Sequence, residues 1–346
     1  MREFIMKKTL SIAAAIATTM AATFCATAHA DGQSNHKSTA SSHAPLGVMG
    51  DHLHNQGEFM FSYRYMHMDM DGSRIGTRRV SARDTVGTMS QPGQFLVAPT
   101  SMPMDMHMLG AMYGLSDNIT LMGMASYASN SMDHLIRNGR EFTTRSSGIG
   151  DTKLSAMVSL FDNGQHKVHW QLGVSLPTGS TTKRDDTPAM KDAFLPYMMQ
   201  IGSGTYDILP AITYAGRRDT VSWGAQLNAV VRTGDNDEGY TLGDQLGATS
   251  WIAKDLNDHL SLSLRVNYQD KDAIDGQNPV LNPSTIQTAV PALQEGERID
   301  LSLGLNYLFG NGHRLAIEYA SPIRQDLVGP QLEIDSVLTL GWQKAF

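Results

Sequence analysis

Residues 101–130 read SMPMDMHMLGAMYGLSDNITLMGMASYASN, and methionine recurs in them with a period of two residues. Side chains of a β-strand point alternately to opposite faces of the sheet. Before the turn, Met106, Met108 and Met112 therefore share one face, whereas Leu109 and Tyr113 share the other. Methionine used only to fill a core would fall among the leucines, so the sorting predicts a strand with a separate methionine face.

The same sorting continues beyond the turn at residues 116–118. Met122 and Met124 alternate with Leu121 and Ala125, and they share their face with serine and threonine. This stretch is therefore predicted to be a β-hairpin with methionines on one side of both strands.

A third strand with this pattern lies upstream, in GEFMFSYRYMHMDM at residues 57–70. Four aromatic residues from Phe59 to Tyr65 form one face, and Met60, Arg64 and further methionines form the other. A face that carries an arginine within a methionine row is neither a lipid-facing surface nor a dry core. It is interpreted as the inner wall of a water-containing structure.

Residues 1–30 have the features of a secretory signal peptide, which is removed on export. Lys7 and Lys8 precede an apolar run, and Ala-His-Ala at residues 28–30 is a small-x-small cleavage site. Cys25 is the only cysteine, so the exported chain is expected to lack disulfides and thiolate metal sites. Removing three cations and one anion with this segment moves the formal charge from −7 to −9. So acidic a chain is not expected to bind nucleic acid.

Residues 31–56 are polar and contain His52 and His54. We interpret them as a flexible, histidine-containing periplasmic tail. The histidines are either incidental residues of a solvated linker or ligands of a metal-capturing arm, because a His-x-His spacing alone is a weak signal.

Residues 57–346 contain about 12 segments in which apolar and polar residues alternate. The connections between these segments are, alternately, short turns and long polar loops. In residues 259–269, for example, Leu260, Leu262 and Leu264 alternate with Ser261 and Ser263. This pattern predicts an all-β fold, a transmembrane antiparallel up-and-down barrel in a bacterial outer membrane. Its short turns would face the periplasm, its long loops the exterior, and its apolar face the outer-membrane lipid.

Several strings resemble a known family: MGDHLHNQGEFMFSYRYMHMDMDG at 49–72, PMDMHMLGAMYGLSDNITLM at 103–122, SLPTGS at 175–180 followed by DDTP at 185–188, and GSGTYDILP at 202–210. They are similar to the Met/His-rich branch of outer-membrane barrels related to the meta-pathway phenol-degradation family. The resemblance implies a transporter-like barrel, in a branch associated with copper resistance. It implies no catalytic residues.

Methionine thioethers are soft, neutral ligands that favour Cu(I) over hard cations, and Ag(I) should follow. We therefore predict a lumen that binds or passes a soft metal ion as cargo, with no required cofactor. The predicted metal ligands are Met60, Met66, Met68, Met70, Met104, Met106, Met108, Met112, Met122 and Met124.

Two other groups of polar residues complete the predicted site. Further ligands at the rim or in the tail are His52, His54, His67 and His107. Inward-facing charges are interpreted as a network that braces the lumen. These are Arg64, Arg232, Arg265, Arg298, Asp300, Glu333 and Asp335.

The pattern leaves two alternatives to metal passage. Methionine also forms an adaptable apolar wall, which suits a channel for small hydrophobic or aromatic solutes. The methionines and the tail could instead plug a structural barrel. No constellation typical of an enzyme is found, so no catalytic activity is expected. Expected partners are a periplasmic metal carrier and the barrel-assembly machinery, which would recognise the last strand ending at Phe346.

Overall fold

The computed structural model describes residues 39–346. The expected signal peptide at residues 1–30 and the first part of the expected tail, residues 31–38, lie outside the described residues. None of the helices formed by residues 39–346 has the length and apolar character needed to cross a bilayer.

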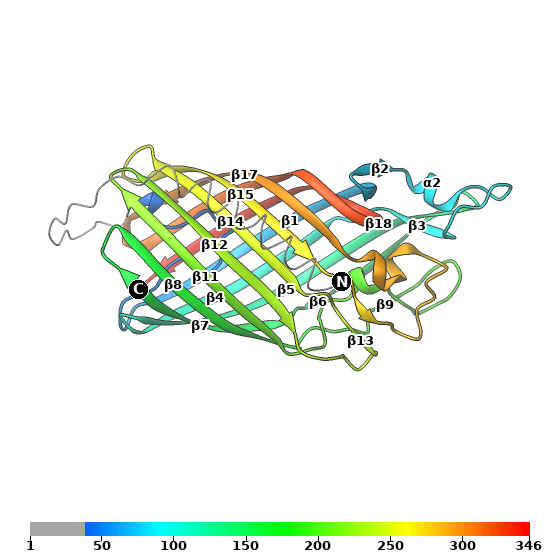
Figure 1. The fold of residues 1–346 in the computed structure, drawn as a ribbon, viewed down its shortest axis with the longest axis horizontal. Helices are drawn as coiled ribbons and strands as arrows, with labels where there is room; N and C mark the ends of the chain where they lie inside the picture. The colour runs from blue at the N-terminus through cyan, green and yellow to red at the C-terminus, as the bar shows by residue number, and fades with distance from the viewer. Residues whose placement is uncertain (1–38) are drawn as a thin grey trace, which may run out of the picture.

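The described chain forms one antiparallel sheet that closes on itself as a barrel (Figure 1). Closure comes from the pairing of β1 with β18, in which Met60 lies opposite Ala345 and Met68 opposite Val337. The strands of the wall are, in chain order, β1 (Phe59–Gly76), β4 (Met104–Ser116), β5 (Ile119–Ile136), β6 (Glu141–Ile149), β7 (Thr152–Asp162), β8 (His166–Leu176), β11 (Asp207–Arg218), β12 (Val221–Arg232), β14 (Gln245–Asp255), β15 (Leu260–Lys271), β17 (Gly296–Leu308) and β18 (His313–Ala345).

Three of these labelled strands do not correspond to one crossing of the wall each. β6 and β7 both pair with β5 and follow each other along one crossing of the wall. β18 turns back near Gly329, whose φ of +72° suits glycine; its first part pairs with β17 and its second part with β1. The described residues therefore cross the wall twelve times, as the sequence predicts.

The connections differ at the two ends of the barrel. Short turns, including η5 (Gly310–Gly312), lie at the end where the chain terminates, and the long loops lie at the opposite end (Figure 1). The loops contain small elements: β2 (Arg78–Val80), α2 (Ala82–Val86), β3 (Val97–Ser101), β9 (Arg184–Asp185), β10 (Ala193–Phe194), η2 (Tyr197–Met199), β13 (Tyr240–Thr241), β16 (Asp275–Gly276), η3 (Gln287–Ala289) and η4 (Pro291–Leu293). Tyr197, Tyr240 and Ile286 of these loops pack into a shared apolar cluster.

The outer face of the wall is apolar, which is the expected surface for lipid. Leu109 is 50% exposed, whereas Met112, on the other face of the same strand, is 6% exposed. Leu262 and Leu264 are exposed as well, while Ser261 and Ser263 between them are buried. The alternation read from the sequence therefore separates lipid-facing from lumen-facing side chains correctly at these positions.

The largest difference from expectation concerns residues 39–56, which we call the plug. The sequence suggests a flexible tail, but the structure places these residues inside the barrel, at the end with the short turns (Figure 1). η1 (Ala40–Ser42) begins the plug and contacts β14, β15 and β17. Leu46 and Val48 are each 2% exposed.

Hydrogen bonds between plug backbone and barrel side chains explain why so polar a segment stays inside. The carbonyls of Ala44, Leu46, Met49 and Gly50 accept bonds of 2.8 Å from Arg314, Arg64, Gln226 and His169 respectively. The Gly47 amide donates to Glu318. Buried backbone polar groups must find partners, and here the wall supplies them.

Candidate metal-binding lumen

The ten predicted methionine ligands, which we call the methionine ladder, lie on the adjacent strands β1, β4 and β5. Met60 pairs with Met112, Met66 with Met106, and Met68 with Met104. The two-residue period on each strand puts the methionines on one face, because antiparallel pairing aligns the same faces of neighbouring strands.

The third strand extends this row. Met112 lies opposite Met122, and Met124 lies opposite Gly110. Neighbouring strands are about 4.8 Å apart, and residues on one face of a strand are about 6.6 Å apart. The methionines therefore occupy successive levels along one face of β1, β4 and β5, and Arg64 faces Met108 between the lower and upper pairs.

The lower part of the ladder packs against the plug. Met60 and Met112 form a buried cluster with Met157 of β7, and Met122 and Leu53 pack against it. Met157 is fully buried. It faces inward by parity, but its strand holds a single methionine, so the sequence does not mark it as a site residue.

A small cavity of about 20 Å³ lies beside this cluster. Met49 and Asp51 of the plug line it together with Met108 and Met124 of the ladder. A volume of this size accommodates roughly one water molecule. Met49 was not predicted as a site residue, because nothing in the sequence of the plug indicates that it lies opposite the ladder.

The upper part of the ladder packs against the long loops. Met70 joins Met102, Met132 and Met199 in a second buried cluster, against which Met68 and Met104 pack. Met199 comes from η2 in the loop between β8 and β11, and Met132 is fully buried. Met102, Met132 and Met199 were not among the predicted ligands. Met199 lies in η2, Met102 lies just before β4, and Met132 lies in the last part of β5.

His67 and His107 lie on the face opposite the ladder. His107 Nδ1 is 2.8 Å from the Tyr63 hydroxyl, and His67 Nδ1 is 2.8 Å from the Asp105 carboxylate. His67 Nε2 is 3.2 Å from Asp69. Their positions agree with polar residues at the rim, and the structure does not bring them to the methionines.

His52 and His54, in contrast, lie in the plug. Their rings are 4.8 Å apart, and the His43 ring lies 4.4 Å from that of His52. Burial lowers the pKa of His43 well below its usual value and lowers that of His54 to about 4. Burial opposes ionisation of Asp51, but His52 beside it holds the pKa of this carboxyl well below the ordinary value.

The seven predicted lumen charges do not form one network. Arg298 pairs with Asp300 at 2.9 Å, and Arg79 bridges Glu333 and Asp335 near the loops. The other arginines pair separately: Arg232 with Asp207 and Arg265 with Glu318.

Arg64 differs from the rest of this set. It donates to the Leu46 carbonyl and contacts the Met49 sulfur. Two of the predicted charges, Arg64 directly and Arg265 through Glu318, therefore hold the plug.

Comparison with solved structures supports the fold. The COG4313 outer membrane channel from Pseudomonas putida F1 matches with a TM-score of 0.61 and 15% identity, over 87% of this chain and 100% of that chain. The Pseudomonas putida toluene transporter TodX matches with a TM-score of 0.41 and 9% identity, over 88% and 95% of the two chains. The KdgM porin matches with a TM-score of 0.40 and 11% identity, over 82% and 99%. The last two scores are too low to carry an argument.

The first of these likenesses shows that the chain has the β-barrel fold of an outer-membrane channel. No curated protein sequence matches the chain. The family model described as "Putative MetA-pathway of phenol degradation" matches residues 81–320, which is more than half of the chain. The plug and the whole of β1 precede the matched region. The chain therefore belongs to this family.

Proposed function

We propose that this barrel binds Cu(I) or Ag(I) on the methionine ladder and passes the ion along the lumen, as part of copper handling. The observation that carries the proposal is the row of methionines on one face of β1, β4 and β5, interrupted by Arg64, which begins at the plug and ends beneath the long loops.

The chemistry of the thioether suits this task. Its sulfur is soft and uncharged, so it prefers Cu(I) and binds it without releasing a proton. Conduction requires repeated sites that each hold the ion weakly enough for it to leave. Paired methionines such as Met66 and Met106 offer two-sulfur sites at successive levels.

The size of the cavity favours a metal ion over a hydrophobic solute. A space of about 20 Å³ next to Met108 and Met124 takes one water-sized particle, and an aromatic ring is several times larger. Passage of an aromatic solute would require the plug to leave the lumen. A soft ion needs only exchange between neighbouring sulfurs.

The test is an Ag(I) titration of the purified exported chain in detergent and chloride-free buffer, followed by calorimetry. The variant carries Met106→Leu, Met108→Leu, Met122→Leu and Met124→Leu, which nearly preserve size and apolarity. We expect its Ag(I) affinity to fall at least about tenfold, because the soft ligands are lost. The control carries Met89→Leu and Met190→Leu, which lie in loops and are 73% and 55% exposed.

Unchanged Ag(I) affinity in the four-site variant would reject metal handling. Uptake of an aromatic solute that persists in the leucine variant and stops with Met→Asp at the same sites would favour the hydrophobic channel instead. Delivery by a periplasmic metal carrier and recognition of Phe346 by the assembly machinery stay predictions.

A further inference from the structure

We propose that the plug contains a second metal site of different chemistry, in which His43, Asp51 and His52 bind a borderline divalent ion such as Cu(II). The site uses imidazole and carboxylate ligands and does not depend on the methionine ladder, so it goes beyond the proposed passage of Cu(I) or Ag(I).

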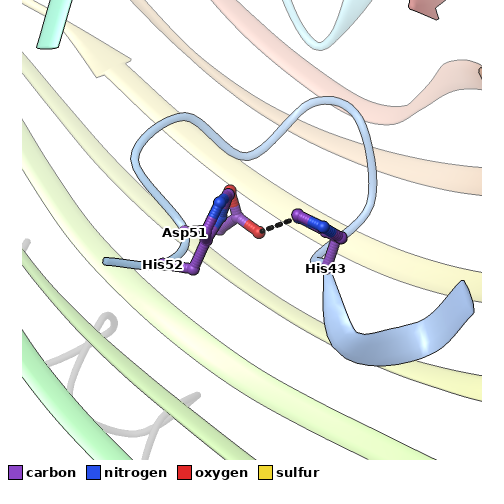
Figure 2. Close-up of side chains that lie close together, drawn as sticks. All are labelled: His43, Asp51 and His52. Carbon is purple, nitrogen blue, oxygen red and sulfur yellow. Dashed lines mark hydrogen bonds and ion pairs between the residues drawn. The ribbon is translucent and has the colours of Figure 1, made fainter. Parts of the chain in front are cut away.

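The geometry of the three side chains suits a single ion. One ligand atom from each lies within 4.8 Å of the other two. His52 Nδ1 is 2.9 Å from one Asp51 oxygen, and His43 Nδ1 is 3.8 Å from the other. Figure 2 shows His43 and Asp51 pointing toward each other across the loop, with His52 beside the carboxylate. Bonds of about 2.0–2.2 Å place ligand atoms about 3–4 Å apart around one ion, so little movement is needed.

Unused lone pairs are a second observation. His43 Nδ1 and His52 Nε2 are buried atoms without a hydrogen-bond partner, and so is His54 Nε2. Buried polar atoms in folded proteins are nearly always paired. Of these atoms, His43 Nδ1 faces Asp51 at 3.8 Å and is therefore placed to bind an ion together with that carboxylate.

The carboxylate is held in place by its surroundings. Asp51 Oδ2 accepts a hydrogen bond of 2.9 Å from the Ala44 amide, which fixes its orientation as outer-shell bonds do in metal sites. The side chains of His43 and His52 each remain 19% exposed. An ion can therefore reach the ligands without unfolding of the plug.

The arginine side chains near Asp51 affect which metal ions the site can bind. Arg314 and Arg64 both interact electrostatically with Asp51, and they reduce the local negative charge. Hard ions such as Mg²⁺ depend on several oxygen ligands and on that charge. Cu(II) gains more from imidazole nitrogens, so it should bind here where Mg²⁺ does not.

A bound ion would also join the two arms of the plug. His43 and His52 are nine positions apart, and a metal bridge between them would close that loop. An ion that binds only the arranged plug stabilises it, and the stabilisation grows with the logarithm of the ion concentration above the dissociation constant. Cu(II) should therefore make the plug more resistant to proteolysis.

The experiment titrates the purified exported chain with Cu(II) and follows both affinity and the electron paramagnetic resonance spectrum. His43→Gln and His52→Gln keep a polar side chain of similar size, and His259→Gln, at the turn before β15, is the matched control. We expect the wild-type spectrum to show nitrogen coupling from two imidazoles, and that of each plug variant to lose one nitrogen. The Cu(II) affinity of each plug variant should be at least about tenfold lower than that of the wild type. A hundredfold excess of Mg²⁺ should not compete.

The two proposals fail separately. The four-site Met→Leu variant should bind Cu(II) normally, and the His43→Gln variant should bind Ag(I) normally. A Cu(II) spectrum and affinity that are unchanged in both His43→Gln and His52→Gln would overturn the plug site. Circular dichroism checks that each variant retains the barrel; if one does not, Asp51→Asn in the intact barrel must lower the affinity in its place.

Discussion

Arg314 of the barrel wall donates a hydrogen bond of 2.8 Å to the Ala44 carbonyl of the plug. The same guanidinium donates to Gln343 and Asn306 at 2.7 Å each, and Arg314 is 4% exposed. One buried charge thus ties both parts of β18 and the neighbouring β17 to a segment 270 residues earlier in the chain. Since hydrogen bonds to charged groups are each worth about 1.5–3 kcal/mol, this contact is a principal anchor of the plug.

We predict that Arg314→Gln loosens the plug. The variant loses the bond to Ala44 and cannot replace the charge, so residues near η1 should be cleaved several times faster by an added protease. The conductance of single barrels in a planar bilayer should rise as the lumen opens. The measurement combines a proteolysis time course with conductance recordings.

Arg324→Gln is the matched control for this change. Arg324 pairs with Asp326, but its side chain is 60% exposed and lies away from the plug. Such exposed pairs contribute little, so both readouts should stay at the wild-type level. Equal cleavage rates in Arg314→Gln and wild type would show that the plug does not depend on this anchor.

The barrel could be predicted from sequence because alternation depends only on neighbouring residues. Met112 and Leu109 lie three positions apart, so strand parity alone assigns them to opposite faces. Met112 pairs with Met122 in the hairpin of β4 and β5, and Met60 pairs with Met112 because β1 lies beside β4.

Strand alternation does not predict the plug, which the sequence leaves open only as one alternative beside a flexible tail. It is held through its backbone carbonyls, such as those of Leu46 and Met49, and every residue type has a carbonyl. The cluster of His43 with Asp51 depends on the shape of an irregular loop, which has no period to read. Met199 reaches the upper methionine cluster from a loop for the same reason.

A glycine at the edge of the plug provides a second prediction. A Cβ on Gly114 would overlap the Asn55 carbonyl oxygen, while the Gly57 amide bonds the Gly114 carbonyl at 2.8 Å. We expect Gly114→Ala to displace the last residues of the plug and to increase hydrogen exchange over residues 50–58. The control is Gly123→Ala on the adjacent strand, where a Cβ would meet only Leu154 at an ordinary 3.5 Å. If both variants exchange like wild type, the contact with Asn55 does not fix the plug.

Met199, which joins the upper methionine cluster from a loop, should respond to volume and not to sulfur. Met199 is fully buried between Met70, Met102 and Met132. Met199→Ala should lower the free energy of unfolding by about 2–5 kcal/mol, because it leaves a cavity in a packed cluster. Met199→Leu conserves volume and should cost less than about 1.5 kcal/mol. Urea unfolding followed by tryptophan fluorescence measures both, and the same samples test Ag(I) binding.

A cluster that only packs the loops against the barrel would leave Ag(I) affinity unchanged in Met199→Leu. A fall in affinity there would mean that the ion path continues from Met104 through the loop methionines toward the cell exterior.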